Sequence, residues 1–90
     1  MKILMTPEFI ENRKAIKDIE VAVAVTKRLA RVEIGNFGDA KSIGDNISEL
    51  RIHQGSGYRI YYSIRGKEII LLLCAGPKSD QEKDIKKQKK

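Results

Sequence analysis

Residues 50–76 decide the fold, and they read LRIHQGSGYRIYYSIRGKEIILLLCAG. Hydrophobicity has a period of two over 50–54 and again over 58–64, which is typical of strands with one covered face. Residues 69–74 are apolar at every position, which favours a strand in the interior of a sheet. Because the turn at 55–57 is short and rich in glycine, the first two strands must pair. The stretch therefore predicts three consecutive antiparallel strands.

Two helices are expected before these strands. A Thr-Pro-Glu start predicts a helix from residue 6 to about 17, and apolar residues at helical spacing predict a second from 19 to about 34. A short strand is expected over 2–5, and the glycine-containing segment 35–47 is interpreted as a loop. A short C-terminal helix is expected over 79–86. The predicted class is α+β, with a helical hairpin packed on a three- to four-stranded antiparallel sheet.

Length and composition limit the classes of protein. The 90 residues allow one domain, 1–90, with a formal net charge of +6. A single cysteine excludes a disulfide framework and a thiolate metal cluster, so neither metal nor cofactor is expected. Because the sequence has neither a membrane-length apolar run nor a secretion signal, we expect a soluble cytoplasmic protein that does not bind membranes. The positive charge favours an acidic partner, either nucleic acid or protein.

The positive charge is concentrated in the second half of the chain. Residues 1–47 carry a net charge of +1, and residues 48–90 carry +5. Six lysines lie in 78–90, and 85–90 are interpreted as a frayed basic tail. The second half faces either solvent alone or the phosphates of a nucleic acid, and the two interpretations are compatible.

Strand alternation also predicts a candidate site. If the apolar residues of the first two strands face the helices, Arg51, His53, Arg59 and Tyr61 share the opposite face, with Lys78 near its rim. Two guanidinium groups, an imidazole, a phenol and an ammonium, without a carboxylate, suit a phosphodiester. The alternative interpretation is that these side chains are polar only because that face is exposed to water.

Six segments of the sequence resemble the RelE/ParE superfamily of type II toxins, in particular its HigB-like addiction module killer branch. The resemblance covers residues 6–85 and is most specific from 35 to 85. The matching segments are Gly35–Asp39, Ser48–His53, Gly55–Tyr62, Leu71–Gly76, Lys78–Gln81 and Asp84-Ile85.

The resemblance implies a strand, two helices and a three-stranded meander. It also implies a cognate antitoxin from an adjacent gene, either acidic or of the helix-turn-helix type, and operator DNA bound only through the antitoxin complex. Ribosome-dependent members cleave mRNA without metal, by attack of the ribose 2′-hydroxyl on the neighbouring phosphate. The alternatives are a ParE-like DNA gyrase inhibitor without nuclease activity and an inactive homologue that binds only its antitoxin.

The resemblance also assigns roles to residues. Arg51, His53 and Arg59 lie where active members carry basic strand residues, and Lys78 lies near their later basic position. Several members have a proton-transfer group after that position, whereas this sequence has none, so His53 and Tyr61 are the expected substitutes. The expected RNA-binding lysines are Lys41, Lys67 and Lys83.

Overall fold

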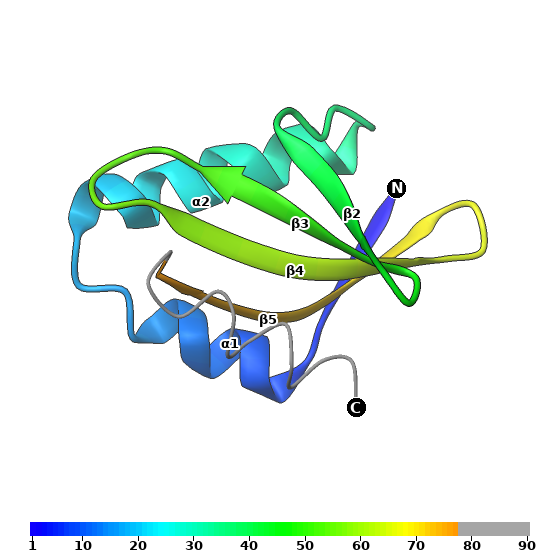
Figure 1. Ribbon diagram of the computed structural model, residues 1–90, viewed down its shortest axis with the longest axis horizontal. Coiled ribbons are helices and arrows are strands. Elements are labelled where there is room, and N and C mark those ends of the chain that lie inside the picture. The colour runs from blue at the N-terminus through cyan, green and yellow to red at the C-terminus, as the bar shows by residue number, and fades with distance from the viewer. Residues whose placement is uncertain (78–90) are drawn as a thin grey trace.

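A five-stranded sheet and two helices make up residues 1–77, the part of the chain that the computed structural model describes (Figure 1). The strand order across the sheet is β1-β5-β4-β3-β2. In chain order the elements are β1 (Lys2–Met5), α1 (Pro7–Lys14), α2 (Ile19–Glu33), β2 (Ala40–Gly44), β3 (Ile47–Ile52), β4 (Tyr58–Arg65) and β5 (Ile69–Pro77).

The α+β class, the two helices and the three consecutive strands are confirmed. β3, β4 and β5 pair as antiparallel neighbours, and β1 pairs with β5 in parallel, Lys2 lying opposite Ile69. The apolar strand β5 therefore lies inside the sheet, as its sequence predicted. The C-terminal helix expected over 79–86 lies outside the described residues.

The interpretation of residues 35–47 as a loop is wrong in part, because β2 pairs with β3 and forms a fifth strand at the edge of the sheet. Asp45 and Asn46 have φ values of 55° and 60°, the left-handed conformation that tight hairpin turns require. Pairing with β3, and not the intrinsic preference of its small and polar residues, makes this segment a strand.

Both helices begin at a polar cap, as expected. Thr6 Oγ1 accepts the Phe9 N–H at 3.1 Å and donates to the Leu73 carbonyl at 2.6 Å, which joins the start of α1 to β5. At α2 the Asp18 carboxylate accepts the Glu20 N–H at 2.9 Å. α1 ends at Lys14, three residues earlier than predicted. Neither helix in residues 1–77 is long and apolar enough to cross a membrane.

A β-bulge in β5 changes which face its side chains point to. Tyr62 lies opposite Leu72 and Tyr61 lies opposite Cys74, so Leu73 is an extra residue in the ladder. Leu72 consequently packs on the helix side of the sheet, whereas Cys74 packs on the other side. The bulge therefore explains why these two residues, which would share a face in a regular strand, contribute to different clusters.

The main hydrophobic core fills the space between the sheet and the helices, with α2 behind β3 and α1 beside β5 (Figure 1). Its buried members are Phe9, Val21, Val25, Leu29, Val32, Leu50, Ile52, Tyr58, Ile60, Tyr62, Ile70, Leu72 and Ala75. A second, smaller cluster of Ile47, Tyr61 and Cys74 lies on the opposite face of the sheet. We call that side the open face, since neither α1 nor α2, the helices of residues 1–77, covers it.

Candidate functional site

Cross-strand pairing brings the candidate arginines together on the open face. Arg51 on β3 lies directly opposite Arg59 on β4, and Arg59 lies opposite Gly76 on β5. On the other side of Arg51, its backbone N–H donates to the Asp39 carbonyl at 2.9 Å. Side chains at directly opposed positions lie close enough to interact. The expectation that Arg51 and Arg59 share one face is therefore confirmed.

A buried carboxylate lies between the two arginines. Glu49 Oε1 is 2.9 Å from Arg51 Nε and 3.0 Å from Arg59 Nη1, and only 1% of the Glu49 side chain is exposed. The expectation of a site without a carboxylate is therefore wrong. Two guanidinium groups at adjacent cross-strand positions repel each other, and the shared carboxylate offsets that repulsion.

The two arginines keep donors beyond those that Glu49 accepts. Each guanidinium has five N–H donors in a planar fork. The side chain of Arg51 is 29% exposed and that of Arg59 is 12% exposed. Arg59 Nε is buried and has no hydrogen-bond partner among the described residues. An anion that reached this cluster would meet donors already oriented by Glu49.

His53 is paired with a second carboxylate, that of Asp39, the residue just before β2. His53 Nε2 lies 2.6 Å from Asp39 Oδ2, with the two side chains 71% and 42% exposed. The hydrogen bond from His53 holds the pKa of the Asp39 carboxyl below its usual value; desolvation opposes this shift, and the charges of Arg51 and Arg28 reinforce it. We call the set of Asp39, Glu49, Arg51, His53 and Arg59 the charged cluster.

Tyr61 lies on the predicted face of the sheet, but its side chain is buried there and is not exposed beside the arginines. The residue is fully buried, packed with Ile47 and Cys74 in the second apolar cluster. Its strand position is the predicted one, opposite Glu49 on β3. Alternation gives the side of a sheet to which a residue points, but it does not show whether neighbouring side chains cover that residue. A fully buried phenol cannot reach a substrate, so His53 is the remaining proton-transfer candidate of the two.

The candidate lysines differ in their relation to the charged cluster. Lys41 is exposed on β2 and lies opposite Glu49, beside the cluster. Lys67 lies in the β4–β5 turn, two residues past the end of β4 at Arg65. Arg59 and Arg65 are six residues apart on this strand, which corresponds to about 20 Å. Lys67 is therefore remote from the cluster. Lys78 and Lys83 lie outside the described residues.

Sequence reasoning missed three members or neighbours of the cluster. Glu49 precedes Arg51 by two residues, so the period of two already placed both on one face. The place of Asp39 beside the cluster was not predicted, because its segment was interpreted as a loop. Arg28 on α2, whose Nη1 lies 3.5 Å from the Asp39 carbonyl, had no sequence signal that linked it to the strands.

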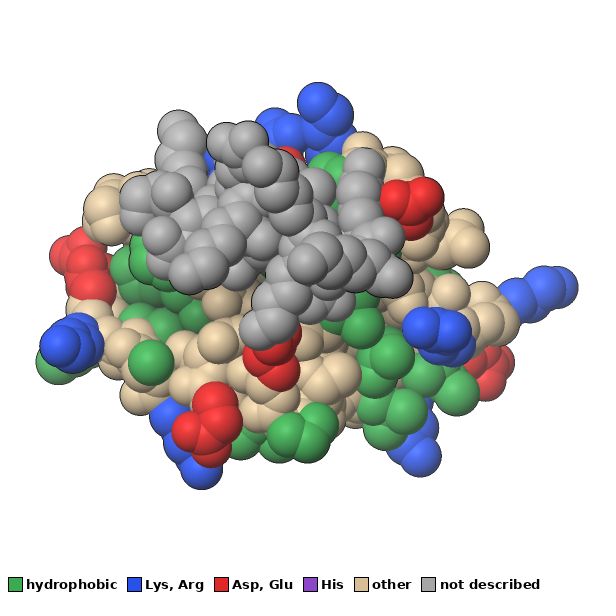
Figure 2. All heavy atoms as spheres, turned by 60° about the horizontal axis from the view of Figure 1, so that its bottom comes forward, with side chains coloured by type: hydrophobic (Ala, Val, Ile, Leu, Met, Phe, Trp, Pro, Cys, Tyr) green, Lys and Arg blue, Asp and Glu red, His purple; other side chains and the backbone are tan. Residues whose placement is uncertain are grey.

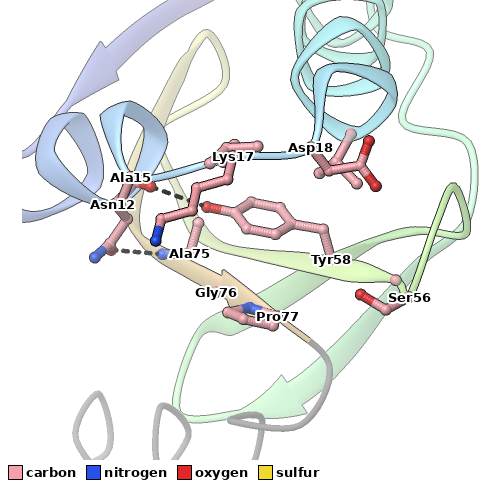
Figure 3. A pocket seen from close by; sticks show the side chains of 12 residues that line it. Asn12, Ala15, Lys17, Asp18, Ser56, Tyr58, Ala75, Gly76 and Pro77 are labelled. Atoms are coloured by element: carbon pink, nitrogen blue, oxygen red, sulfur yellow. Dashed lines mark hydrogen bonds between the residues drawn. The ribbon is translucent and has the colours of Figure 1, made fainter.

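A cavity of about 430 Å³ lies at the connection between the two helices, where the end of α1, the start of α2, the β3–β4 turn and the end of β5 meet (Figure 3). Two of its polar residues serve the fold. Asn12 Oδ1 accepts the Ala75 N–H at 2.9 Å, and the Tyr58 hydroxyl donates to the Asn12 carbonyl at 3.4 Å. Because these groups are already bonded to each other and to the backbone, the charged cluster is the stronger candidate site.

The side of the molecule that carries α1 shows side chains of both charges (Figure 2). Residues 1–77 contain twelve basic and nine acidic side chains. In the view that brings the α1 side forward, Lys and Arg side chains alternate with Asp and Glu around the margin (Figure 2). The described side chains that are visible in Figure 2 therefore form no large patch of positive charge.

Comparisons with known proteins agree with this architecture. The crystal structure of the isolated E. coli RelE toxin matches with a TM-score of 0.69 at 14% identity, over 96% of both chains, so the RelE fold is confirmed. An uncharacterized protein of Haemophilus influenzae is 45% identical over 74 residues, which is 82% of this chain and 75% of that protein. The model of the phage-derived Gp49-like family (DUF891) matches residues 9–90. The chain therefore belongs to the phage-derived Gp49-like protein family.

Proposed function

We propose that this chain is the toxin of a type II toxin–antitoxin pair, of the HigB-like branch, and that it cleaves mRNA on the ribosome. One observation carries the proposal: Arg51 and Arg59 face each other on adjacent strands and are held by the same buried carboxylate. Pre-oriented guanidinium groups stabilise the negative charge that grows on a phosphate during displacement. The RelE fold supports the choice of RNA over other phosphate esters.

Side chains of the charged cluster and water are sufficient for the proposed chemistry. The ribose 2′-oxygen forms a bond to the phosphorus, and the bond from phosphorus to the 5′-oxygen breaks, which leaves a 2′,3′-cyclic phosphate and a 5′-hydroxyl. His53 takes the proton from the 2′-hydroxyl, and water supplies a proton to the leaving 5′-oxygen. Arg51 and Arg59 bind the non-bridging oxygens. Glu49 keeps both guanidinium groups in place.

The proposal includes the partners. The antitoxin is a protein from the adjacent gene, acidic or of the helix-turn-helix type, and it covers the charged cluster or blocks entry into the ribosome. Complementary charge would increase its association rate and its specificity more than its affinity. Operator DNA is bound only through that complex, and the toxin acts in the cytoplasm.

The test compares Arg59→Ala with Arg31→Ala, which removes the same charge from an exposed position on α2. Each variant and the wild type is induced briefly without antitoxin, and the 5′ ends of cellular RNA are mapped. We expect new cuts within translated mRNA and growth arrest for the wild type and for Arg31→Ala. Arg59→Ala should produce neither. Circular dichroism at the growth temperature should show that this variant is still folded, although less stable, because Glu49 loses one of its two guanidinium partners.

The alternatives give different results in the same experiment. Growth arrest with DNA breaks and intact transcripts would replace the proposal with gyrase inhibition. A wild-type chain that does not arrest growth would identify an inactive homologue. Full toxicity of Arg59→Ala would show that the charged cluster is not the site.

A further inference from the structure

The backbone of Asp39 is held on two sides. Its carbonyl accepts the Arg51 N–H at 2.9 Å, which extends the β2–β3 ladder by one residue, and Arg28 Nη1 lies 3.5 Å from the same oxygen. The preceding Gly38 has a φ of +68°, and a Cβ there would lie 3.3 Å from the Arg28 guanidinium carbon. The backbone of Asp39 is therefore fixed at the point where the loop beside α2 joins the sheet.

The Asp39 side chain forms a hydrogen bond with His53 on the same face. His53 lies one residue past the end of β3 and two residues after Arg51, and Asp39 lies just before β2, so the two are diagonal neighbours across the extended β2–β3 pair. Asp39 Oδ2 lies 2.6 Å from His53 Nε2. An ionised carboxylate can only accept, so Nε2 carries the proton of this hydrogen bond. Nδ1 of the largely exposed ring is then the nitrogen left to exchange a proton with a ligand.

We propose that Asp39 is a positioning residue for His53 in RNA cleavage, an inference that rests on the proposed function. The carboxylate fixes the orientation of the ring and the position of its proton, so that the lone pair of Nδ1 faces away from Asp39. When Nδ1 accepts the proton of the 2′-hydroxyl, the ring becomes positively charged, and the adjacent carboxylate stabilises that charge. Water protonates the 5′-oxygen, and the resulting hydroxide then deprotonates the imidazolium, so protons balance over the cycle.

The distinguishing experiment is a double-mutant cycle on cleavage of ribosome-bound mRNA under single-turnover conditions. The variants are Asp39→Asn, His53→Gln and both together. Asp18→Asn is the control, because it removes the same charge while asparagine still caps α2. The measurements are the cleavage rate constant at saturating toxin and, separately, the toxin concentration that gives half the maximal rate.

We expect Asp39→Asn to lower the rate constant about 10-fold and His53→Gln to lower it about 100-fold, since loss of a general base costs at least this much. The half-saturating concentration should change less than about 2-fold, because neither group is proposed to hold the phosphate. In the His53→Gln background, Asp39→Asn should change the rate less than about 2-fold, since it acts only through the ring. Asp18→Asn should cleave at the wild-type rate.

Two results would overturn the inference while the proposed function stands. One is a wild-type rate for Asp39→Asn, and the other is an equal loss in both backgrounds, which would mean that Asp39 acts independently of His53. Absence of Arg59-dependent cleavage by the wild type would instead remove the proposed function, and this role with it. His53 is the only histidine, so its ring resonances report directly whether Asp39→Asn releases the ring.

Discussion

The two faces of the sheet are stabilised in different ways, although the same strands supply both. On the helix side, Leu50 and Ile60 pack beneath the helices in a large apolar core. On the open face, the neighbouring Glu49 and Arg59 form a buried ion pair next to a small apolar cluster. Apolar packing tolerates many partners of suitable size, whereas a buried charge requires a specific partner. The helix side therefore carries most of the stability, and the open face carries the charged residues to which we assign the proposed chemistry.

The largest effect is expected on the helix side. Leu50→Ala should lower the free energy of unfolding by about 2–5 kcal/mol, because Leu50 is fully buried and its truncation leaves a cavity. Denaturant unfolding followed by circular dichroism measures this. The control is Ile64→Ala, since Ile64 on β4 is 47% exposed and its truncation should cost about 1 kcal/mol or less. Similar costs for the two variants would show that the core around Leu50 contributes no more than an exposed position on the same side of the sheet.

A smaller loss is expected from the buried carboxylate of the open face. Glu49→Gln should lower the free energy of unfolding by about 2–3 kcal/mol, because it removes the charge between two partly buried guanidinium groups. Glu33→Gln on the exposed end of α2 is the control, with an expected change below about 0.5 kcal/mol. Because the pair is buried, 1 M salt should not remove the difference. Equal stability of the two variants would show that Glu49 is not needed to hold the arginines.

Much of the fold followed from local sequence patterns. The period of two predicted β3 and β4, and the apolar run correctly predicted that β5 lies inside the sheet. β2 could not be predicted in this way, because it is a strand through its pairing with β3. The parallel pairing of β1 with β5 joins segments more than sixty residues apart, and neither segment carries a signal that specifies the other.

The candidate site was predicted less completely than the fold. Alternation placed Arg51 and Arg59 together, because neighbouring strands fix the positions of their side chains. It also placed Tyr61 on that face, but its burial depends on packing with Cys74, which the bulge at Leu73 turns to the same side. The role of Glu49 required the distances to both guanidinium groups, which no one-dimensional pattern contains.

The smallest effect is expected at the exposed edge of the charged cluster. The pKa of Asp39 is lower in the folded chain than its usual value, first because of the hydrogen bond from His53. A carboxyl of this kind stabilises the fold above its unfolded pKa of about 3.9, and that contribution is lost as the pH falls through the folded pKa. The stability difference between the wild type and Asp39→Asn should therefore shrink below about pH 4. In His53→Gln, the carboxyl carbon resonance of Asp39 should titrate at higher pH than in the wild type; an unchanged titration would mean that the imidazole does not hold the carboxylate, and the open face would then depend on Glu49 alone.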